Sequence, residues 1–328
     1  MLLSPAARAI LDKAAPGRFS RLPPQFAGTT PPTFAAILTL REASQLVGLA
    51  PTVLTTIDPE LRALPVTNAD KIARCARYDT VRPKFNLAKG KPRALLFQKV
   101  NGFYHADAVP AAHDAFVAMA ARKGWAIAAT DKGGAFNART LGQFDVVLWN
   151  NNSGDVLTLS QRRALKVYIE NGGGFVAIHG AGGDPAYFWD WYADGLLGAR
   201  FKGHPMAPQF QDARVSIADA SHPIAKGLPS EWTMNDEWYS FKTNPRIAGA
   251  KVILTLDEST YKPVGPNGQD LRMGDHPLAW TKCIGKGRAF YSAIGHRAES
   301  YSQPQHVALL EAAIAWAADK SQECDPRN

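Results

Sequence analysis

A histidine stands at the end of a glycine-flanked apolar run. Residues 172–183 read GGGFVAIHGAGG, with His179 between the apolar run and the second glycine cluster. In many α/β enzymes a reactive residue lies where a buried strand breaks sharply toward a helix. An imidazole at such a turn is suited to proton transfer near neutral pH. We therefore predict a functional role for His179; the alternative is an ordinary histidine in a turn.

Polar side chains also follow other predicted strands. NGFYH comes after residues 93–100, the run NNNSGD overlaps the end of residues 144–150, and GHR ends the last predicted strand. Ligands of open α/β sheets bind beyond the carboxyl ends of the strands, so we expect these side chains to converge at one edge. The residues that we assign to proton transfer are His105, His179, Glu237 and His296.

Two aromatic-rich stretches are candidates for substrate contacts, NDEWYSF (235–241) and YFWDWY (187–192). A carboxylate in the first is either a base whose pKa is raised by partial burial, a metal ligand, or the partner of an arginine such as Arg288. Indoles beside amides and carboxylates suit a sugar, although a core patch has the same composition. The residues that we assign to substrate binding are Asn150, Asn151, Asp184, Trp189, Tyr239 and Arg288.

The histidines show no HxH or HExxH spacing that would mark a metal site. A site assembled from His105, His179, His204 and Glu237 would nevertheless suit zinc or a similar divalent ion. A metal-free acid/base pocket is our default, so no cofactor is assigned and a divalent metal is kept as the alternative. His204, His222 and His276 each precede a proline, which favours a role in turns.

Strands and helices alternate from residue 93 onward, which indicates a parallel sheet. We expect strands at 93–100, 125–130, 144–150 and 175–180, with helices at 109–124 and from Ser160. Four further strands follow without intervening helices, and GKG (285–287) is typical of a hairpin turn between the last two. Those strands are 215–220, 251–256, 277–284 and 287–294, and a final helix is expected at 304–319. The prediction is one mixed-sheet α/β domain over 93–320, with helices on both faces and a tail over 321–328.

Residues 1–92 differ from the rest and are predicted to form a basic, partly helical extension. Helices are expected at 31–51, closed by Pro51, and at 69–78. Residues 1–93 hold 14 Lys and Arg against 6 Asp and Glu, which accounts for the whole net charge of +8. The basic residues are scattered, so we expect a solvated or docking surface and no nucleic-acid partner.

Three widely spaced cysteines form no CxxC pair, so neither a disulfide nor a zinc site is expected, and a reducing compartment is the default. No apolar stretch is long enough to span a bilayer, and no membrane partner is expected. Arg8, Asp12 and Lys13 interrupt the segment where a secretory signal would need its apolar core. We expect a cytoplasmic protein, with the periplasm left open if a native signal was removed. A homo-oligomer is also left open.

Several phrases, taken in order, resemble the ThuA-like family, named for trehalose utilisation. They are GGGFVAIHGAGG, DWYADGLLGARFKGHP, SHPIAKGLP, NDEWYSF, DHPLAW and GKGRAFYSAIGH, and the resemblance covers roughly 93–320. It implies the flavodoxin-like, class I glutamine amidotransferase-like fold. In amidotransferases of that superfamily a cysteine nucleophile occupies the turn where His179 stands here, so amidotransfer is not expected. The resemblance implies a role with disaccharides or their oxidised 3-keto forms.

Two functions are carried forward. The first is an enzyme of the isomerase, lyase or hydrolase type that acts on a disaccharide, a glycoside or a keto-sugar derivative by His/Glu acid–base chemistry, with or without a metal. The second is a non-catalytic sugar-binding or regulatory domain that kept the fold. Several converging titratable groups favour the enzyme, because a binding module has little use for them.

Overall fold

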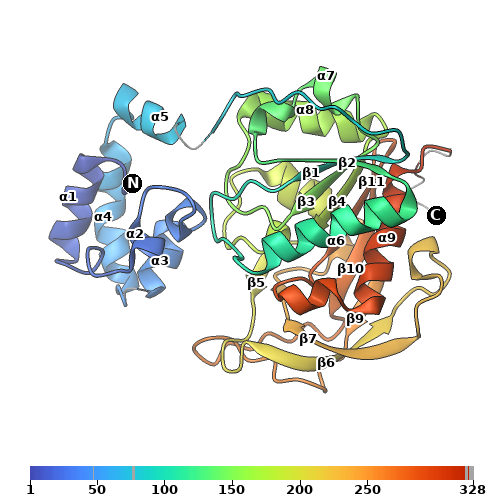
Figure 1. Ribbon diagram of the computed structural model, residues 1–328. Coiled ribbons are helices and arrows are strands. Elements are labelled where there is room, and N and C mark those ends of the chain that lie inside the picture. Colours follow the sequence, from blue (N-terminus) through green and yellow to red (C-terminus); the bar gives the residue numbers. More distant parts are fainter. Residues whose placement is uncertain (47, 76–77, 322–323, 325–328) are drawn as a thin grey trace.

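The computed structural model describes residues 1–46, 48–75, 78–321 and 324 (Figure 1). The strands are β1 (Arg93–Phe97), β2 (Ala126–Thr130), β3 (Val146–Asn150), β4 (Gly174–Ile178), β5 (Phe201–Gly203), β6 (Phe210–Ile217), β7 (Glu231–Glu237), β8 (Ser240–Phe241), β9 (Lys251–Leu256), β10 (Pro277–Ile284) and β11 (Gly287–Ser292). The α-helices are α1 (Pro5–Ala14), α2 (Pro24–Ala27), α3 (Leu40–Leu46), α4 (Pro51–Ala63), α5 (Asn68–Cys75), α6 (Ala108–Lys123), α7 (Ala138–Leu141), α8 (Leu159–Glu170) and α9 (Pro304–Ala318).

A nine-stranded mixed sheet forms the core, in the order β2-β1-β3-β4-β11-β10-β9-β6-β7. Strands β1 to β4 and β11 pair in parallel, whereas the pairs from β11 through β10, β9, β6 and β7 are antiparallel. The chain crosses to opposite sides of β1 when it forms β2 and then β3. Such a reversal opens a crevice beyond the carboxyl ends of the strands, which is where ligands of these sheets bind.

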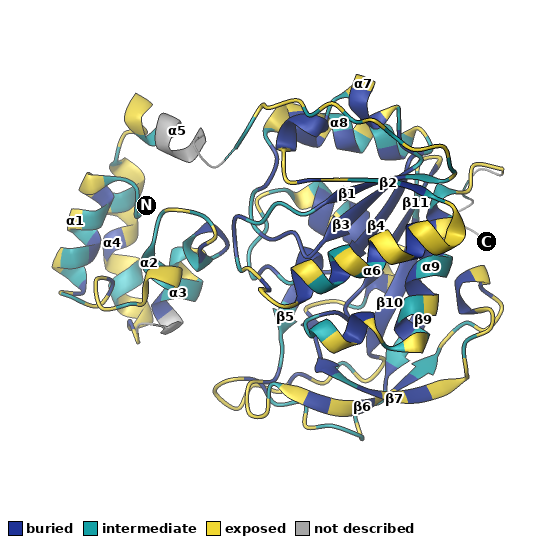
Figure 2. Cartoon of the chain, in the orientation of Figure 1, coloured by how far each residue is buried: buried dark blue, intermediate teal, exposed yellow. Residues whose placement is uncertain are grey.

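Helices cover both faces of the parallel half, with α6 and α9 on one side and α7 and α8 on the other (Figure 1). Every residue of β3 and β4 is buried, because a parallel strand between two helical layers has no solvent face (Figure 2). Helix α8 begins after a capping box in which Thr158 and Gln161 satisfy each other's backbone N–H groups. The predicted mixed α/β fold with helices on both faces is therefore confirmed.

Most predicted elements of 93–320 appear within a few residues of the expected bounds, and β10 and β11 form the expected hairpin. The single helix expected over 31–51 is wrong. That stretch contains a 3₁₀ helix (Phe34–Ala36) and α3, and Pro51 opens α4 instead of closing a helix. Proline fits the first turn of a helix, where its missing N–H leaves no bond unmade. The second helix, expected over 69–78, is α5; residues 76 and 77 lie outside the described part.

The N-terminal helices have a small core of their own, formed by Leu11, Ala15, Phe19, Leu49 and Ile57. The segment between α2 and α3 contacts the loop after β1. The backbone N–H of Thr33 donates to the carbonyl oxygen of Asn101 at 3.1 Å, and the rings of Phe34 and Phe103 lie 5.1 Å apart. The extension therefore lies against the carboxyl edge of the sheet.

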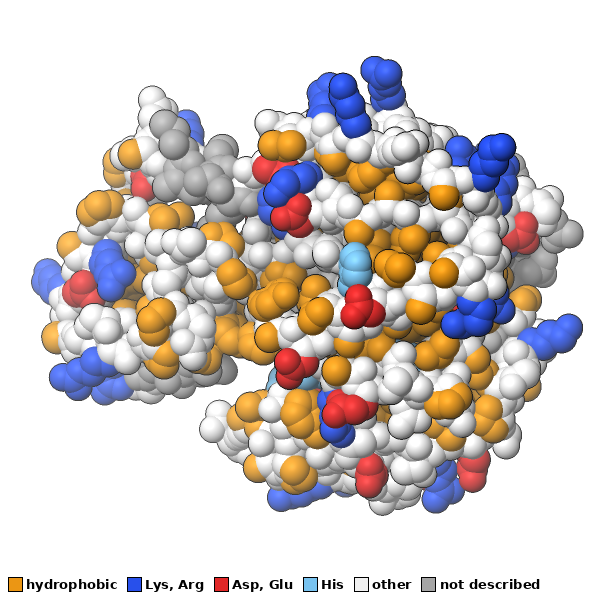
Figure 3. All heavy atoms as spheres, in the orientation of Figure 1, with side chains coloured by type: hydrophobic (Ala, Val, Ile, Leu, Met, Phe, Trp, Pro, Cys, Tyr) orange, Lys and Arg blue, Asp and Glu red, His pale blue; other side chains and the backbone are white. Residues whose placement is uncertain are grey.

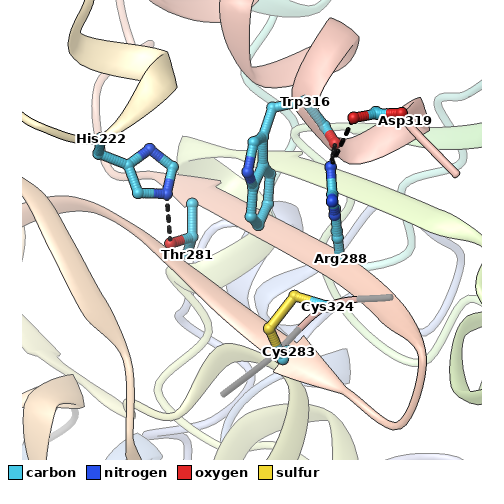
Figure 4. The surroundings of a disulfide bond; sticks show 7 residues. All are labelled: His222, Thr281, Cys283, Arg288, Trp316, Asp319 and Cys324. Carbon is cyan, nitrogen blue, oxygen red and sulfur yellow. Dashed lines mark hydrogen bonds and ion pairs between the residues drawn. A yellow bond between two sulfur atoms is a disulfide. The ribbon is translucent and has the colours of Figure 1, made fainter. Parts of the chain in front are cut away.

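Cys283 and Cys324 form a disulfide, which corrects the expectation that no cysteines pair (Figure 4). The bond joins the end of β10 to the C-terminal tail, of which only residues 321 and 324 are described. Beside it, Arg288 donates to the carbonyl oxygen of Trp316 and pairs with Asp319. Because disulfides persist in oxidising surroundings, the cysteines give no support to a reducing compartment.

Candidate functional site

His179 follows β4 directly, in a strained turn, and is completely buried. Its φ is +39°, a conformation that non-glycine residues rarely adopt. Nδ1 of His179 donates to the carbonyl oxygen of Ala293 at 2.8 Å. The hydroxyl of Tyr291 donates to the backbone carbonyl oxygen of His179 at 2.9 Å. Strain of this kind persists only where the surroundings fix the residue, and it is concentrated at functional sites.

Three more groups from separate elements meet His179. One potential ligand atom from each of His105, His179, Glu237 and His296 lies within 4.8 Å of all the others. Nε2 of His179 is 3.2 Å from Nδ1 of His296 and 3.4 Å from Oε2 of Glu237, and the latter two atoms are 3.0 Å apart. We call these four residues the histidine–glutamate cluster.

His105 comes from the loop after β1 and packs edge-on against both other imidazoles, at 4.9 Å from His179 and 4.6 Å from His296. It reaches this position because residue 180 is glycine. A Cβ on Gly180 would lie 2.7 Å from Cε1 and 2.9 Å from Nδ1 of His105. The glycine after His179 therefore makes room for a second imidazole.

Asp236, next to Glu237 on β7, holds the loop that carries His296. Its carboxylate accepts from the backbone N–H groups of Gly295 and His296, at 2.8 and 3.1 Å, and from the hydroxyl of Ser300 at 2.7 Å. Adjacent residues of a strand point to opposite faces, so one carboxylate positions the loop while the other enters the cluster. Asp236 is a positioning residue.

His204 touches the cluster from its more open side. Its Nδ1 is 2.9 Å from the carbonyl oxygen of Pro205 and 3.1 Å from Oε1 of Glu237. The side chains of His204 and His296 are 23% and 16% exposed, against 0% for His179 and 1% for Glu237. Solvent therefore reaches His204 and His296, whereas His179 and Glu237 lie behind them.

Burial and hydrogen bonding set opposite charge states in this group. Burial holds the pKa of His105 well below its ordinary value, and the neighbouring imidazoles add to that effect. Burial also lowers the pKa of His204. Burial alone would raise the pKa of Glu237, but its interactions with the neighbouring imidazoles of His179 and His296 outweigh burial, and the pKa lies well below the usual range. The site thus combines an ionised Glu237 with neutral imidazoles at His105 and His204.

The predicted residues fall into two groups. The four assigned to proton transfer lie together, and Tyr239 stacks on His179 with ring centroids 4.1 Å apart. In the predicted metal set, the structure puts His296 where we expected His204.

The other predicted substrate-binding residues lie outside the cluster, although the side-chain oxygen of Asn151 accepts from the backbone N–H of Gly180, next to His179, at 3.0 Å. Asn150 donates to the carbonyl oxygen of Val109, and Asn151 to Asn150 and Tyr301. Asp184 accepts from Ser153 and Gly154, and Trp189 packs on Tyr192. Arg288 stands near the start of β11, whereas His296 follows its end, so the structure does not bring Arg288 to the site.

Three neighbours of the cluster were not singled out from the sequence. The amide of Gln209 donates to Oε1 of Glu237. The rings of Phe103 and Phe210 lie 4.7 Å from His105 and 5.1 Å from His296, respectively. Phe103 could have been predicted, because it lies in the phrase NGFYH that follows a predicted strand. Gln209 and Phe210 lie in a stretch that shows no motif.

The family model for ThuA, described as trehalose utilisation, matches residues 93–317. The chain belongs to the ThuA family. That family gives it the class I glutamine amidotransferase-like fold and a carbohydrate-related role. A ThuA-like protein from Bacteroides uniformis ATCC 8492 is 26% identical with a TM-score of 0.62, over 73% of this chain and 97% of that one. A ThuA-like protein from Parabacteroides merdae ATCC 43184 is 20% identical with a TM-score of 0.53, over 72% of this chain and 93% of that one. No curated protein matches.

None of the helices in the described part of this ThuA protein is long and apolar enough to cross a membrane. On the face shown in Figure 3, Lys and Arg side chains are interspersed with Asp and Glu and form no continuous basic stripe. This distribution agrees with the scattered charge of the N-terminal sequence.

Proposed function

We propose that this ThuA protein is an enzyme of carbohydrate metabolism that moves a proton on a keto-sugar derivative of a disaccharide or glycoside. The observation that carries the proposal is the histidine–glutamate cluster with His204 beside it. Burying several titratable groups together is unfavourable for folding, and such groups are concentrated at functional sites. The family's carbohydrate role supports a sugar as the substrate.

His204 has the geometry of a general base. A carbonyl oxygen can only accept, so the contact with Pro205 places the imidazole proton on Nδ1 and leaves the lone pair on Nε2. Glu237 lies 3.1 Å from the same Nδ1 and stabilises the imidazolium that forms when Nε2 takes a proton. Histidine bases of hydrolases are oriented by a carboxylate in the same manner.

The reaction starts at a C–H bond beside the sugar carbonyl. Nε2 of His204 takes the proton, and the electron pair of the C–H bond moves to the carbonyl oxygen to give an enolate. A cation held by the cluster would stabilise the negative oxygen. Return of the proton to the neighbouring carbon gives an isomer, whereas loss of an alkoxide from the adjacent position gives a lyase reaction. Phe103 and Phe210 offer apolar surfaces for the C–H faces of the ring.

The test is solvent exchange. The protein is incubated in D₂O with trehalose, sucrose and maltose and with their 3-keto derivatives, and deuterium at the carbons beside the carbonyl is followed by proton NMR. Wild-type protein is expected to exchange or convert a keto derivative, and His204→Gln to slow that reaction by roughly 10²–10⁴-fold. His113→Gln is the matched control, because His113 lies on α6, contacts Gln98 and is outside the site.

Equal rates for wild type and His204→Gln would exclude His204 as the base. If the sugars bind without exchange or conversion of any of them, the domain is a non-catalytic sugar-binding module instead.

A further inference from the structure

The hydrogen bonding of His179 leaves an electron pair facing other electron pairs. Because the carbonyl oxygen of Ala293 can only accept, Nδ1 of His179 carries the proton. Nε2 therefore presents a lone pair to Oε2 of Glu237 at 3.4 Å and to Nδ1 of His296 at 3.2 Å. A proton on Nδ1 of His296 can be donated to Nε2 of His179 or to Oε2 of Glu237, but not fully to both. The arrangement therefore favours a cation between these three atoms.

The three separations match a coordination sphere. In a tetrahedral site with bonds of about 2.0–2.1 Å, neighbouring ligand atoms are about 3.3 Å apart. The separations among His179 Nε2, His296 Nδ1 and Glu237 Oε2 are 3.2, 3.4 and 3.0 Å. A single ion can therefore contact all three atoms without any of them moving far.

His105 completes the set. One of its ring nitrogens lies within the same 4.8 Å group, and its Nδ1 is buried without a hydrogen-bond partner among the residues that the structure describes. A buried imidazole with no partner for its nitrogen is unfavourable unless a ligand is bound there.

Another histidine–glutamate pair in the same protein looks different. His276 contacts Oε1 of Glu258 at 2.8 Å through Nδ1 and the carbonyl oxygen of Tyr239 at 2.9 Å through Nε2. Both of its nitrogens are satisfied by single partners, as expected of a structural pair. The histidine–glutamate cluster instead directs several electron pairs to one point.

We propose that His105, His179, Glu237 and His296 bind one divalent transition-metal ion. Three imidazoles and one carboxylate suit zinc, iron, cobalt or nickel better than calcium or magnesium, which prefer oxygen ligands. The inference deepens the proposed function and rests on it only for the ion's role. That role is to polarise the sugar carbonyl and stabilise the enolate oxygen while His204 takes the proton.

The contacts around the proposed ligands fit this assignment. Metal-binding histidines commonly donate their other nitrogen to a backbone carbonyl, as His179 does to Ala293. Oε1 of Glu237 is held by Gln209 and His204, which leaves Oε2 for the ion. Asp236 fixes the backbone of His296.

The experiment uses the full chain, stripped with a chelator and titrated with Co²⁺, whose visible absorption reports coordination; Zn²⁺ is then added as a competitor. Wild type is expected to bind about one equivalent of Co²⁺, and Zn²⁺ to displace it. Losing a residue that only hydrogen-bonds to a ligand weakens metal binding by about 10–100-fold, so Glu237→Gln, which changes a ligand itself, is expected to weaken it by at least roughly 100-fold. Glu258→Gln is the matched control and is expected to bind as wild type does. Circular dichroism checks that each variant is folded.

The inference is overturned if folded wild type binds no Co²⁺ or Zn²⁺, or if Glu237→Gln binds as tightly as wild type. Its failure is separable from failure of the proposed function. Metal-free protein that still exchanges keto-sugars at the full rate would refute the metal role alone. One bound ion without any exchange or conversion would support the site and refute the function.

Discussion

Asp184 is expected to make the protein less stable as the pH rises from about 5 to about 7. Its side chain is buried and accepts from the backbone N–H of Gly154 at 2.7 Å and from the hydroxyl of Ser153. Burial, which outweighs these bonds, raises the pKa of Asp184 from 3.8 to about 7. The neutral carboxyl can still donate to Ser153, whose hydroxyl oxygen accepts.

The direction and the size follow from this difference. In the unfolded chain Asp184 ionises near its ordinary value of 3.8, whereas the folded protein keeps the proton up to about pH 7. The unfolded state is therefore stabilised by ionisation throughout this interval, and the free energy of unfolding falls as the pH rises. Since one pKa unit corresponds to about 1.4 kcal/mol, the fall between about pH 5 and about pH 7 is about 2 kcal/mol.

Asp184→Asn removes the titration and keeps the shape, because the amide donates to Ser153 and its oxygen accepts from Gly154. Urea unfolding of wild type and variant is measured at about pH 5 and about pH 7. The variant should gain about 2 kcal/mol relative to wild type over that interval. Asp131→Asn, at an exposed carboxylate, is the control and should show no such gain. Parallel pH dependences for wild type and Asp184→Asn would mean that Asp184 is ionised in the folded protein, which would refute the reasoning.

Three further predictions concern other parts of the molecule. Replacing both Cys283 and Cys324 by serine should lower the free energy of unfolding, measured with urea, by about 4 kcal/mol. This figure is the chain entropy of closing a loop of 41 residues. Without a reducing agent, the denatured wild type should react with a thiol reagent at one of its three cysteines. Gly180→Ala should displace His105 and weaken Co²⁺ binding with the fold intact by circular dichroism, and unchanged binding would contradict the close approach. Phe34→Ala should remove the ring contacts with Phe26 and Phe103, each worth about 0.5–1.5 kcal/mol, and so speed limited proteolysis between α5 and β1. An unchanged cleavage rate would show that these rings do not hold the extension against the sheet.

The convergence of the site was predictable because it depends on a general property of parallel sheets. The carboxyl ends of β1, β4 and β11 meet at one edge, so His105, His179 and His296 were predictable from their places after strands. Arg288 failed the same test, since it lies near the opposite end of β11.

The remaining errors have physical causes. Strand β7 was not predicted, although Trp232 and Met234 alternate with polar residues in the period-two pattern of a half-buried strand. The disulfide was missed because its cysteines are 41 residues apart, and only folding brings them together. The position of Phe210 depends on the register between β6 and β7, which sets it opposite Glu237, and Gln209 lies in the loop before it; periodicity encodes neither.

The spread of the cluster along the chain has a consequence for how the protein folds. Its four members stand at positions 105, 179, 237 and 296, and each follows or ends a different strand. No shorter stretch of the sequence contains the site, so it forms only after long loops have closed and β1, β4, β7 and β11 belong to one sheet. Anything bound there stabilises the completed sheet over every partly folded state. Recovery of Co²⁺ absorption during refolding is therefore expected to be a late event, after most secondary structure has returned.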